Sequence, residues 1–310
     1  MKNRRAFTFI ELVFVLVVMG IITKFGVEFL AQAYRGYLYE QIGSKLHDTS
    51  SIALETIAKR LQYRVKNSVI IRDATNANWA NNYKALEGES SATGYDILEW
   101  IGYDIEGFRG NSNTTPLWGG IIDKEYAHAT PIPLDLYLPG TDTTKIDTLI
   151  KSLSNNLSGI DDSAIYIMST QSDIFSDYGW DGNTITDQTH AVHPVKKDTN
   201  ISKLLSSNSD NFAGLNNNLS DSRAKLCWSA YAIVYDSAHK KLWLYENYQP
   251  WNGEKYTDGV AHLIMDNVST FKKRQSFGVM KIQVCTKSPL TKQASTDQEQ
   301  YSICKEKTIY

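Results

Sequence analysis

Proline is missing from the first 115 residues of this 310-residue chain, and all seven prolines lie at Pro116 or later. Proline is the residue that most strongly interrupts a helix, so no such break divides the N-terminal region. Apolar residues recur there at three- and four-residue spacing, as on one face of a helix. They are Ile42, Leu46, Ala53, Leu54, Ile57, Ala58, Leu61 and Val65. The pattern predicts one helix from Phe7 to about Lys66, about 90 Å long.

The chain also lacks a large excess of positive or negative charge. The 32 Lys and Arg residues nearly balance the 34 Asp and Glu residues, which leaves a formal net charge of −2. A general nucleic-acid-binding surface needs a basic face, so we expect no nucleic acid as a partner. The chain also lacks a serine nucleophile elbow, a Walker loop and an internal repeat. The sequence therefore does not predict an enzyme.

Metal-ligand patterns occur only in weak form. Asp187, His190 and His193 are spaced at threes, but on a loop this spacing is weakly specific for a metal. Asp181, Asn183 and Asp187 resemble a fragment of a calcium loop that lacks the bidentate acid of a complete EF-hand. We therefore expect neither a metal nor a cofactor, and calcium at these three residues is the weaker alternative.

A long apolar run lies at the N-terminus, directly after the cationic segment 2–5. Residues 12–22 contain no polar side chain, and Glu11 is the one acid in the run. Such a run favours insertion into a bilayer, and the positive flank predicts a cytoplasmic N-terminus. Residues 7–31 are therefore predicted to be the transmembrane half of the long helix, and residues 32–67 its amphipathic half.

Two simpler interpretations of this run are a secretory signal peptide and a plain signal anchor. A signal peptide needs a small-residue cleavage site, and nothing of the A-x-A type follows Ile22. A plain anchor gives no reason for Glu11, because a carboxylate within hydrocarbon is costly and should have a partner.

The segment Arg5-Ala6-Phe7-Thr8-Phe9-Ile10-Glu11-Leu12-Val13 resembles the processing site of type IV pilin-like proteins. In that family a dedicated peptidase cuts on the cytoplasmic side before the Phe and methylates the new amino terminus. The resemblance implies a leader peptide over residues 1–6, cleavage between Ala6 and Phe7, and N-methylation of Phe7. It places Glu11 at the fifth mature position, as the family requires, while Ala6 stands where Gly is usual.

The same resemblance implies a role for the acid. As in related subunits, Glu11 would pair with the Phe7 amine of a neighbour when the subunit enters a filament. An unpaired charge in hydrocarbon is costly, so the pair would reward assembly. The implied partners are the prepilin peptidase, other minor and major pseudopilins or pilins, the inner-membrane assembly platform and the lipid bilayer.

The rest of the chain, residues 68–310, reads as a β-rich periplasmic head with a short helix at Asp142–Leu157. Residues 74–94 are a polar, turn-rich loop, and residues 170–224 are predicted to be largely loop. Alternation and turn signals predict the strands. They are Val69–Ile71, Tyr95–Tyr103, Leu134–Leu138, Ile165–Met168, Ser229–Tyr235, Lys241–Tyr248, Phe271–Ser276, Val279–Val284 and Tyr301–Tyr310. The predicted fold class is α+β, with the long helix packed on an antiparallel sheet.

This order of elements resembles the minor pseudopilins of type II secretion systems. Leu263–Cys285 resembles the J-type subunit, in which a helix-turn-strand pair closes the head. The resemblance implies a single-pass inner-membrane protein that is incorporated near the tip of a pseudopilus and supports protein export. The alternatives are a minor pilin of a type IV pilus or DNA-uptake system, and a tip adhesin that binds a ligand through its aromatic residues. A membrane-anchored hydrolase is the remaining alternative.

Three cysteines are present, Cys227, Cys285 and Cys304. A periplasmic head would lie in an oxidising compartment, where a disulfide is expected. Cys285–Cys304 would close a loop between the last two predicted strands and stabilise the head by about 3 kcal/mol on the loop-entropy model. Cys227–Cys285 is the alternative pairing, and either one leaves one thiol as a small buried hydrophobe.

Overall fold

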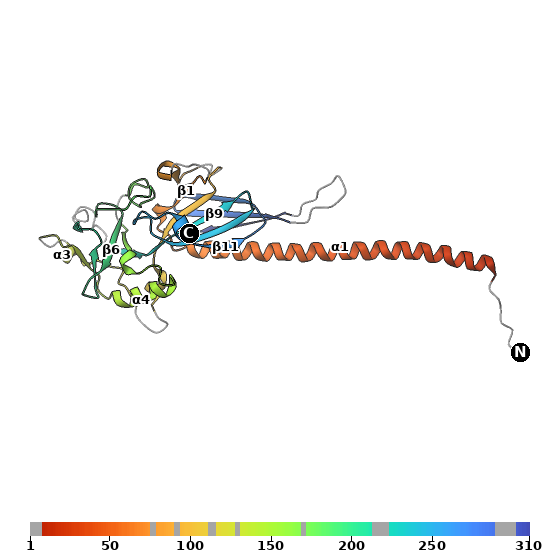
Figure 1. Cartoon of the computed structure of the whole chain (residues 1–310), viewed down its shortest axis with the longest axis horizontal. Coiled ribbons are helices and arrows are strands. Elements are labelled where there is room, and N and C mark those ends of the chain that lie inside the picture. The colour runs from red at the N-terminus through yellow and green to blue at the C-terminus, as the bar shows by residue number, and fades with distance from the viewer. Residues whose placement is uncertain are drawn as a thin grey trace.

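The computed structural model shows one long helix that projects from a β-rich head (Figure 1). The helix, α1, runs from Phe9 to Leu61. Its free half and the head lie at opposite ends of the molecule. The structure describes residues 8–74, 79–89, 94–110, 116–127, 131–168, 172–212, 223–288 and 302–310.

Helix α1 is continuous over 53 residues, which corresponds to about 80 Å. Thr8 precedes it in an extended conformation, and its carbonyl accepts hydrogen bonds from the backbone N–H groups of Glu11 and Leu12. The helix ends at Leu61, earlier than the predicted Lys66, and a 3-10 turn follows at Lys66–Ser68 (η1). The predicted stripe is confirmed from Leu46 onward. The buried residues of α1 are Leu46, Ser50, Ala53, Leu54, Ile57, Ala58 and Leu61.

The central sheet has six strands in the order β11-β10-β9-β3-β1-β2, and all neighbours are antiparallel. Leu242 and Leu244 lie on the face that packs against α1, opposite to Trp243 and Tyr245, because successive side chains of a strand alternate between the two faces. The bounds are β1 Ile70–Arg72, β2 Tyr83–Ala85, β3 Ile97–Gly102, β9 Ser229–Asp236, β10 Lys241–Tyr248 and β11 Val260–Met265.

A small antiparallel sheet, β12-β13-β14, packs with α1 against the central sheet. Its strands are β12 Val268–Ser276, β13 Val279–Lys287 and β14 Ser302–Ile309. The helix that the J-type resemblance implies within Leu263–Cys285 is a wrong prediction, because the structure forms β11 and the start of β12 there, whereas the predicted strands Phe271–Ser276 and Val279–Val284 are confirmed within β12 and β13. Asn267 turns the chain between β11 and β12 with φ 55°, a left-handed conformation that a helix cannot contain.

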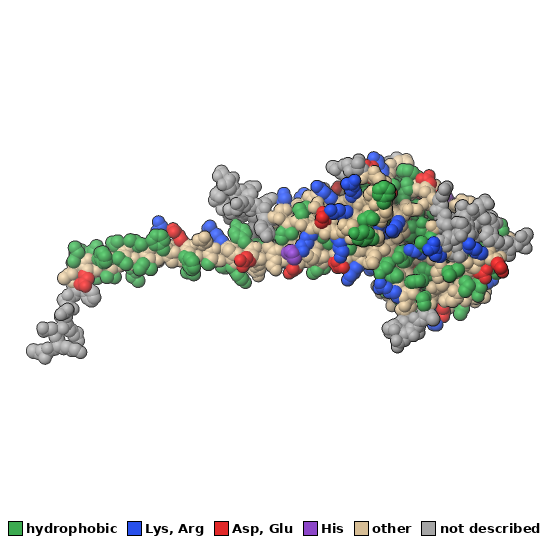
Figure 2. Space-filling view, turned by 180° about the vertical axis from the view of Figure 1, so that it is seen from behind, with side chains coloured by type: hydrophobic (Ala, Val, Ile, Leu, Met, Phe, Trp, Pro, Cys, Tyr) green, Lys and Arg blue, Asp and Glu red, His purple; other side chains and the backbone are tan. Residues whose placement is uncertain are grey.

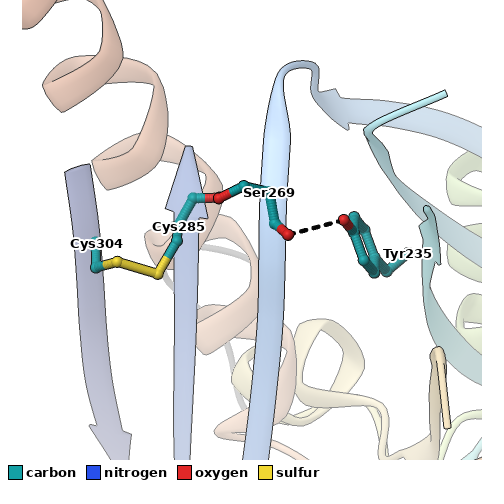
Figure 3. Close-up of a disulfide and its surroundings, with 4 residues drawn as sticks. All are labelled: Tyr235, Ser269, Cys285 and Cys304. Carbon is teal, nitrogen blue, oxygen red and sulfur yellow. Dashed lines mark hydrogen bonds between the residues drawn. A yellow bond between two sulfur atoms is a disulfide. The ribbon is translucent and has the colours of Figure 1, made fainter. Parts of the chain in front are cut away.

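A disulfide joins β13 to β14. Cys285 and Cys304 are directly opposite in register and form the bond, which is the first of the two pairings that the sequence left open. Beside it, the Ser269 hydroxyl donates to the Cys285 carbonyl, and the Tyr235 hydroxyl donates to the Ser269 carbonyl at 3.0 Å (Figure 3). These bonds connect the disulfide-bonded sheet to the central sheet. Cys227 is the free cysteine and is buried, and burial raises the pKa of its thiol.

A distal sheet lies at the end of the head away from the free half of α1 (Figure 1). Its strand order is β4-β7-β6-β5-β8. The bounds are β4 Asp135–Tyr137, β5 Ala164–Ile167, β6 Val192–Lys197, β7 Lys203–Ser206 and β8 Ala224–Cys227. The loop predicted over 170–224 is therefore wrong at β6 and β7. The first four residues of β6 are all buried, so this strand has no apolar-polar alternation that the sequence could reveal.

The predicted short helix is confirmed as α4, Thr143–Leu153, and the Asp142 side chain accepts a hydrogen bond from the Lys145 N–H at its start. The remaining short elements are η2 Trp79–Asn81, α2 Ile105–Arg109, α3 Lys124–Ala127, η3 Ile160–Asp162 and η5 Tyr256–Asp258.

Three apolar clusters connect the layers. One joins α1 and the small sheet to one face of the central sheet, and a second joins the opposite face to β5, β6 and β8. The third lies between the distal sheet and α4. The head is thus α+β with antiparallel sheets, as predicted, and α1 is anchored in it by the second half alone.

Candidate membrane and assembly helix

The first half of α1 presents its apolar side chains outward. Every described residue from 8 to 37 is exposed, and Figure 2 shows the apolar side chains along this half. Segment 9–30 is about 33 Å long, which matches the roughly 30 Å hydrocarbon core of a bilayer. Among the described residues, α1 is the one helix long and apolar enough to cross a membrane. Exposed apolar surface on this scale needs a covering, and lipid or neighbouring helices would provide it.

Aromatic residues mark the end of the apolar segment. Tyr34, Tyr37 and Tyr39 are exposed and begin four residues after Leu30. They point in several directions around the helix, since residues three and five apart are about 60° and 140° away from each other. Tyr and Trp are enriched at membrane–water boundaries, so this ring of tyrosines fits such a boundary. The head first covers α1 at Leu46, about 10 Å further along.

Glu11 lies in the first turn of α1 and is exposed. The Thr8 hydroxyl donates to its carboxylate at 3.5 Å, and the helix dipole favours an acid at this end. Ala6 and Phe7 lie outside the described residues. Peptidase cleavage between them, methylation of Phe7 and the Glu11–Phe7 charge pair therefore remain predictions.

The weak metal candidates are engaged in local bonds. Asp181 accepts hydrogen bonds from the backbone and side chain of Asn183. Asp187 accepts from Thr189 and lies 3.5 Å from the Nε2 atom of His190. Within the part of the chain that the structure describes, no group of three or more His, Cys, Asp or Glu side chains could hold a metal ion. The structure gives no geometric support to calcium at Asp181, Asn183 and Asp187.

His193, by contrast, is buried in β6 next to Phe212. Neither of its ring nitrogens has a hydrogen-bond partner among the described residues. Burial, with a smaller contribution from the charge of His190, lowers the pKa of His193 to about 4. The backbone of Gln188 and the charges of Asp177 and Asp187 act in the opposite direction but do not offset the burial. His193 is therefore neutral in the folded head.

This burial predicts loss of stability in mild acid. Below about pH 6.5 the unfolded chain takes up a proton that folded His193 accepts only near pH 4. Stability should therefore fall as the pH drops from about 6.5 to 4, by about 3 kcal/mol in total. His193→Leu should remove this component, as measured by urea unfolding at pH 7 and pH 4.5.

His239→Gln, at a side chain that is 73% exposed, is the control that should behave like wild type. An equal acid loss in His193→Leu and wild type would contradict the assignment.

Two features were missed in the sequence. Arg72 and Glu99 form a buried ion pair between β1 and β3, although they lie 27 residues apart. Phe277, between β12 and β13, is 97% exposed with a positive φ of 51°. A Phe-Gly pair between two strand signals could have indicated a tight turn, but the exposure of the ring had no local signal.

Comparison of the chain with models of known protein families, with curated proteins and with solved structures found no match.

Proposed function

We propose that this protein is a pilin-like assembly subunit that is anchored in the bacterial inner membrane by the first half of α1 and carries its head in the periplasm. The observation that carries the proposal is the exposed apolar half-helix with an acid, Glu11, in its first turn. A plain anchor has no need of that acid. Pairing with the Phe7 amine of a neighbouring subunit would satisfy it at the moment of assembly.

Within this class we propose that the protein is a minor pseudopilin of a type II secretion system and that it lies near the tip of the pseudopilus. The proposal rests on the similarity of the processing segment and of the order of elements in the sequence. The prepilin peptidase, sibling pseudopilins and the assembly platform are its proposed partners. A minor pilin of a type IV pilus or DNA-uptake system, and a tip adhesin, are the competing assignments that the experiment must separate.

The test is deletion of the gene, followed by measurement of the culture-supernatant proteome and of surface pili in the same strain. Loss of secreted proteins with pili intact is the expected result. Loss of pili or DNA uptake with secretion intact would make the protein a minor pilin. Loss of ligand adhesion alone, with secretion and piliation intact, would favour the adhesin.

Complementation identifies the role of the acid. Wild type should restore export and Glu11→Val should not, whereas the matched control Glu28→Gln, at the other acid of this half-helix, should restore it. Mass spectrometry of the amino-terminal peptide should find methylated Phe7 as its first residue. A peptide that still begins at Met1 would contradict the pilin-like assignment.

A further inference from the structure

The turn between β12 and β13 is conformationally unusual. Ser276 pairs with Val279, so Phe277 and Gly278 form a two-residue hairpin loop. Both have positive φ, 51° and 72°. Turns of this kind favour Asn, Asp or Gly at both central positions, because a side chain is strained there. A bulky residue at the first position is an outlier that calls for a reason.

The turn is held in this conformation by contacts from two other parts of the chain. The Glu87 carboxylate accepts hydrogen bonds from the Phe277 N–H at 2.6 Å, from the Gly278 N–H at 3.2 Å and from the Gln275 amide at 2.8 Å. Buried Arg64, just beyond α1, donates to the Gly278 carbonyl at 2.7 Å. These bonds fix the backbone of the turn and leave the Phe277 ring unburied.

A second aromatic residue lies at the same end of the small sheet. Met280 pairs with Ile309, so Tyr310, the residue directly after β14, lies beside the start of β13. Phe277 is 97% exposed and Tyr310 is 80% exposed. Side chains as exposed as these contribute little to the packing of the core. Large aromatic side chains that stand free on a rigid frame are instead typical anchors of protein–protein interfaces.

Cationic side chains lie near these rings, together with the acids Glu87 and Glu306. Arg274 and Lys281 are exposed and lie directly opposite each other on β12 and β13, a pairing of like charges that costs stability. Lys281 also pairs with Glu306 at 2.8 Å. The Lys66 side chain lies close to Gly278. Positive charges around apolar anchors are complementary to a surface that carries acids.

We propose that the hairpin-tip patch, formed by Phe277, Tyr310, Arg274 and Lys281, is a docking anchor for a different protein that offers an apolar pocket rimmed by Asp or Glu. An anionic lipid surface has similar chemistry but is out of reach. Arg64, which binds the turn, comes 34 residues after Leu30, the end of the apolar segment. At the rise of an α-helix this separation is about 50 Å. The exclusion of lipid rests on the membrane anchorage proposed above.

The test places a photo-reactive benzoylphenylalanine at position 277 of the full-length protein in its native membranes. We expect an adduct with one different protein, mapped to a peptide that contains acidic residues. Charge reversal by Arg274→Glu with Lys281→Glu should reduce the adduct at least about tenfold. The same label at Leu263, which is 49% exposed on β11, is the control and should not form this adduct. No adduct, an adduct with lipid or with a second copy of the chain, or an adduct insensitive to charge reversal would overturn the proposal.

A second variant separates docking from folding. Phe277→Asn supplies a residue that favours positive φ, so the melting temperature should stay equal or rise. Complementation of the deletion strain should nevertheless fail, whereas Phe277→Tyr should succeed. A lower melting temperature in Phe277→Asn would show that the ring serves the fold and overturn the proposal. Because the adduct does not depend on which machine contains the protein, its loss is distinguishable from failure of the proposed function.

Discussion

Replacing Glu99 by Ala is expected to destabilise the head by about 3–5 kcal/mol, because it leaves the buried guanidinium of Arg72 without its counter-charge. The two side chains are 1% and 0% exposed, and Nε of Arg72 lies 2.6 Å from the Glu99 carboxylate. The Tyr248 hydroxyl donates to the other carboxylate oxygen at 3.0 Å. A loss of this size is a large part of the 5–15 kcal/mol that typically holds a domain together.

The remaining contacts of Arg72 explain why the guanidinium cannot simply leave the core. It donates to the backbone carbonyls of Trp79 and Trp180 and to the Asn82 side chain, and it lies 3.8 Å above the Trp79 ring. The ion pair thus connects β1 and β3 to the segment around Trp180. Glu99→Gln should cost less than Glu99→Ala, since the amide oxygen can still accept from Arg72.

Urea unfolding of the full-length protein in detergent measures the effect of Glu99→Ala. The matched control is Glu246→Ala on the same sheet. Glu246 pairs with Arg60 at 3.2 Å, but its side chain is 26% exposed, so we expect a cost of about 1 kcal/mol or less. A smaller loss for Glu99→Ala than for Glu246→Ala would contradict the importance assigned to burial of the pair.

Two arginines in the free half of α1 should abolish membrane integration. Leu16→Arg with Val17→Arg places two cations near the middle of the apolar segment, at a cost of about 2.5–3.5 kcal/mol each. Both native side chains are more than half exposed, so the fold of the head should not change. We expect the variant to be extracted from membranes by alkaline carbonate, while wild type remains in the pellet.

Ile52→Arg is the control for this experiment. Ile52 is 66% exposed and lies on the same helix, in the half that packs on the head. Its substitution should leave both integration and the melting temperature unchanged. Full membrane retention of the double arginine variant would contradict the assignment of residues 9–30 as the spanning segment.

Elements whose signals are local were predicted well. Helix α1 follows from a proline-free stretch with a regular stripe, and α4 follows from its apolar face. The β9–β10 hairpin follows from alternation around a polar turn. The errors occurred where burial hid the pattern, as in β6, or where similarity to the J-type subunit favoured a helix before the predicted strand Phe271–Ser276, in the segment that forms β11.

The sequence by itself determined that a long helix begins the chain, that its first half is apolar enough for a membrane, and that antiparallel strands follow. These properties depend on residues near each other along the chain, because helix and strand periodicities are local. The tertiary structure alone decided that Cys285 pairs with Cys304, that Arg72 and Glu99 meet in the core, and that Phe277 stands exposed on a fixed turn. Each depends on contacts between distant segments, and no local pattern encodes which distant residues will be neighbours.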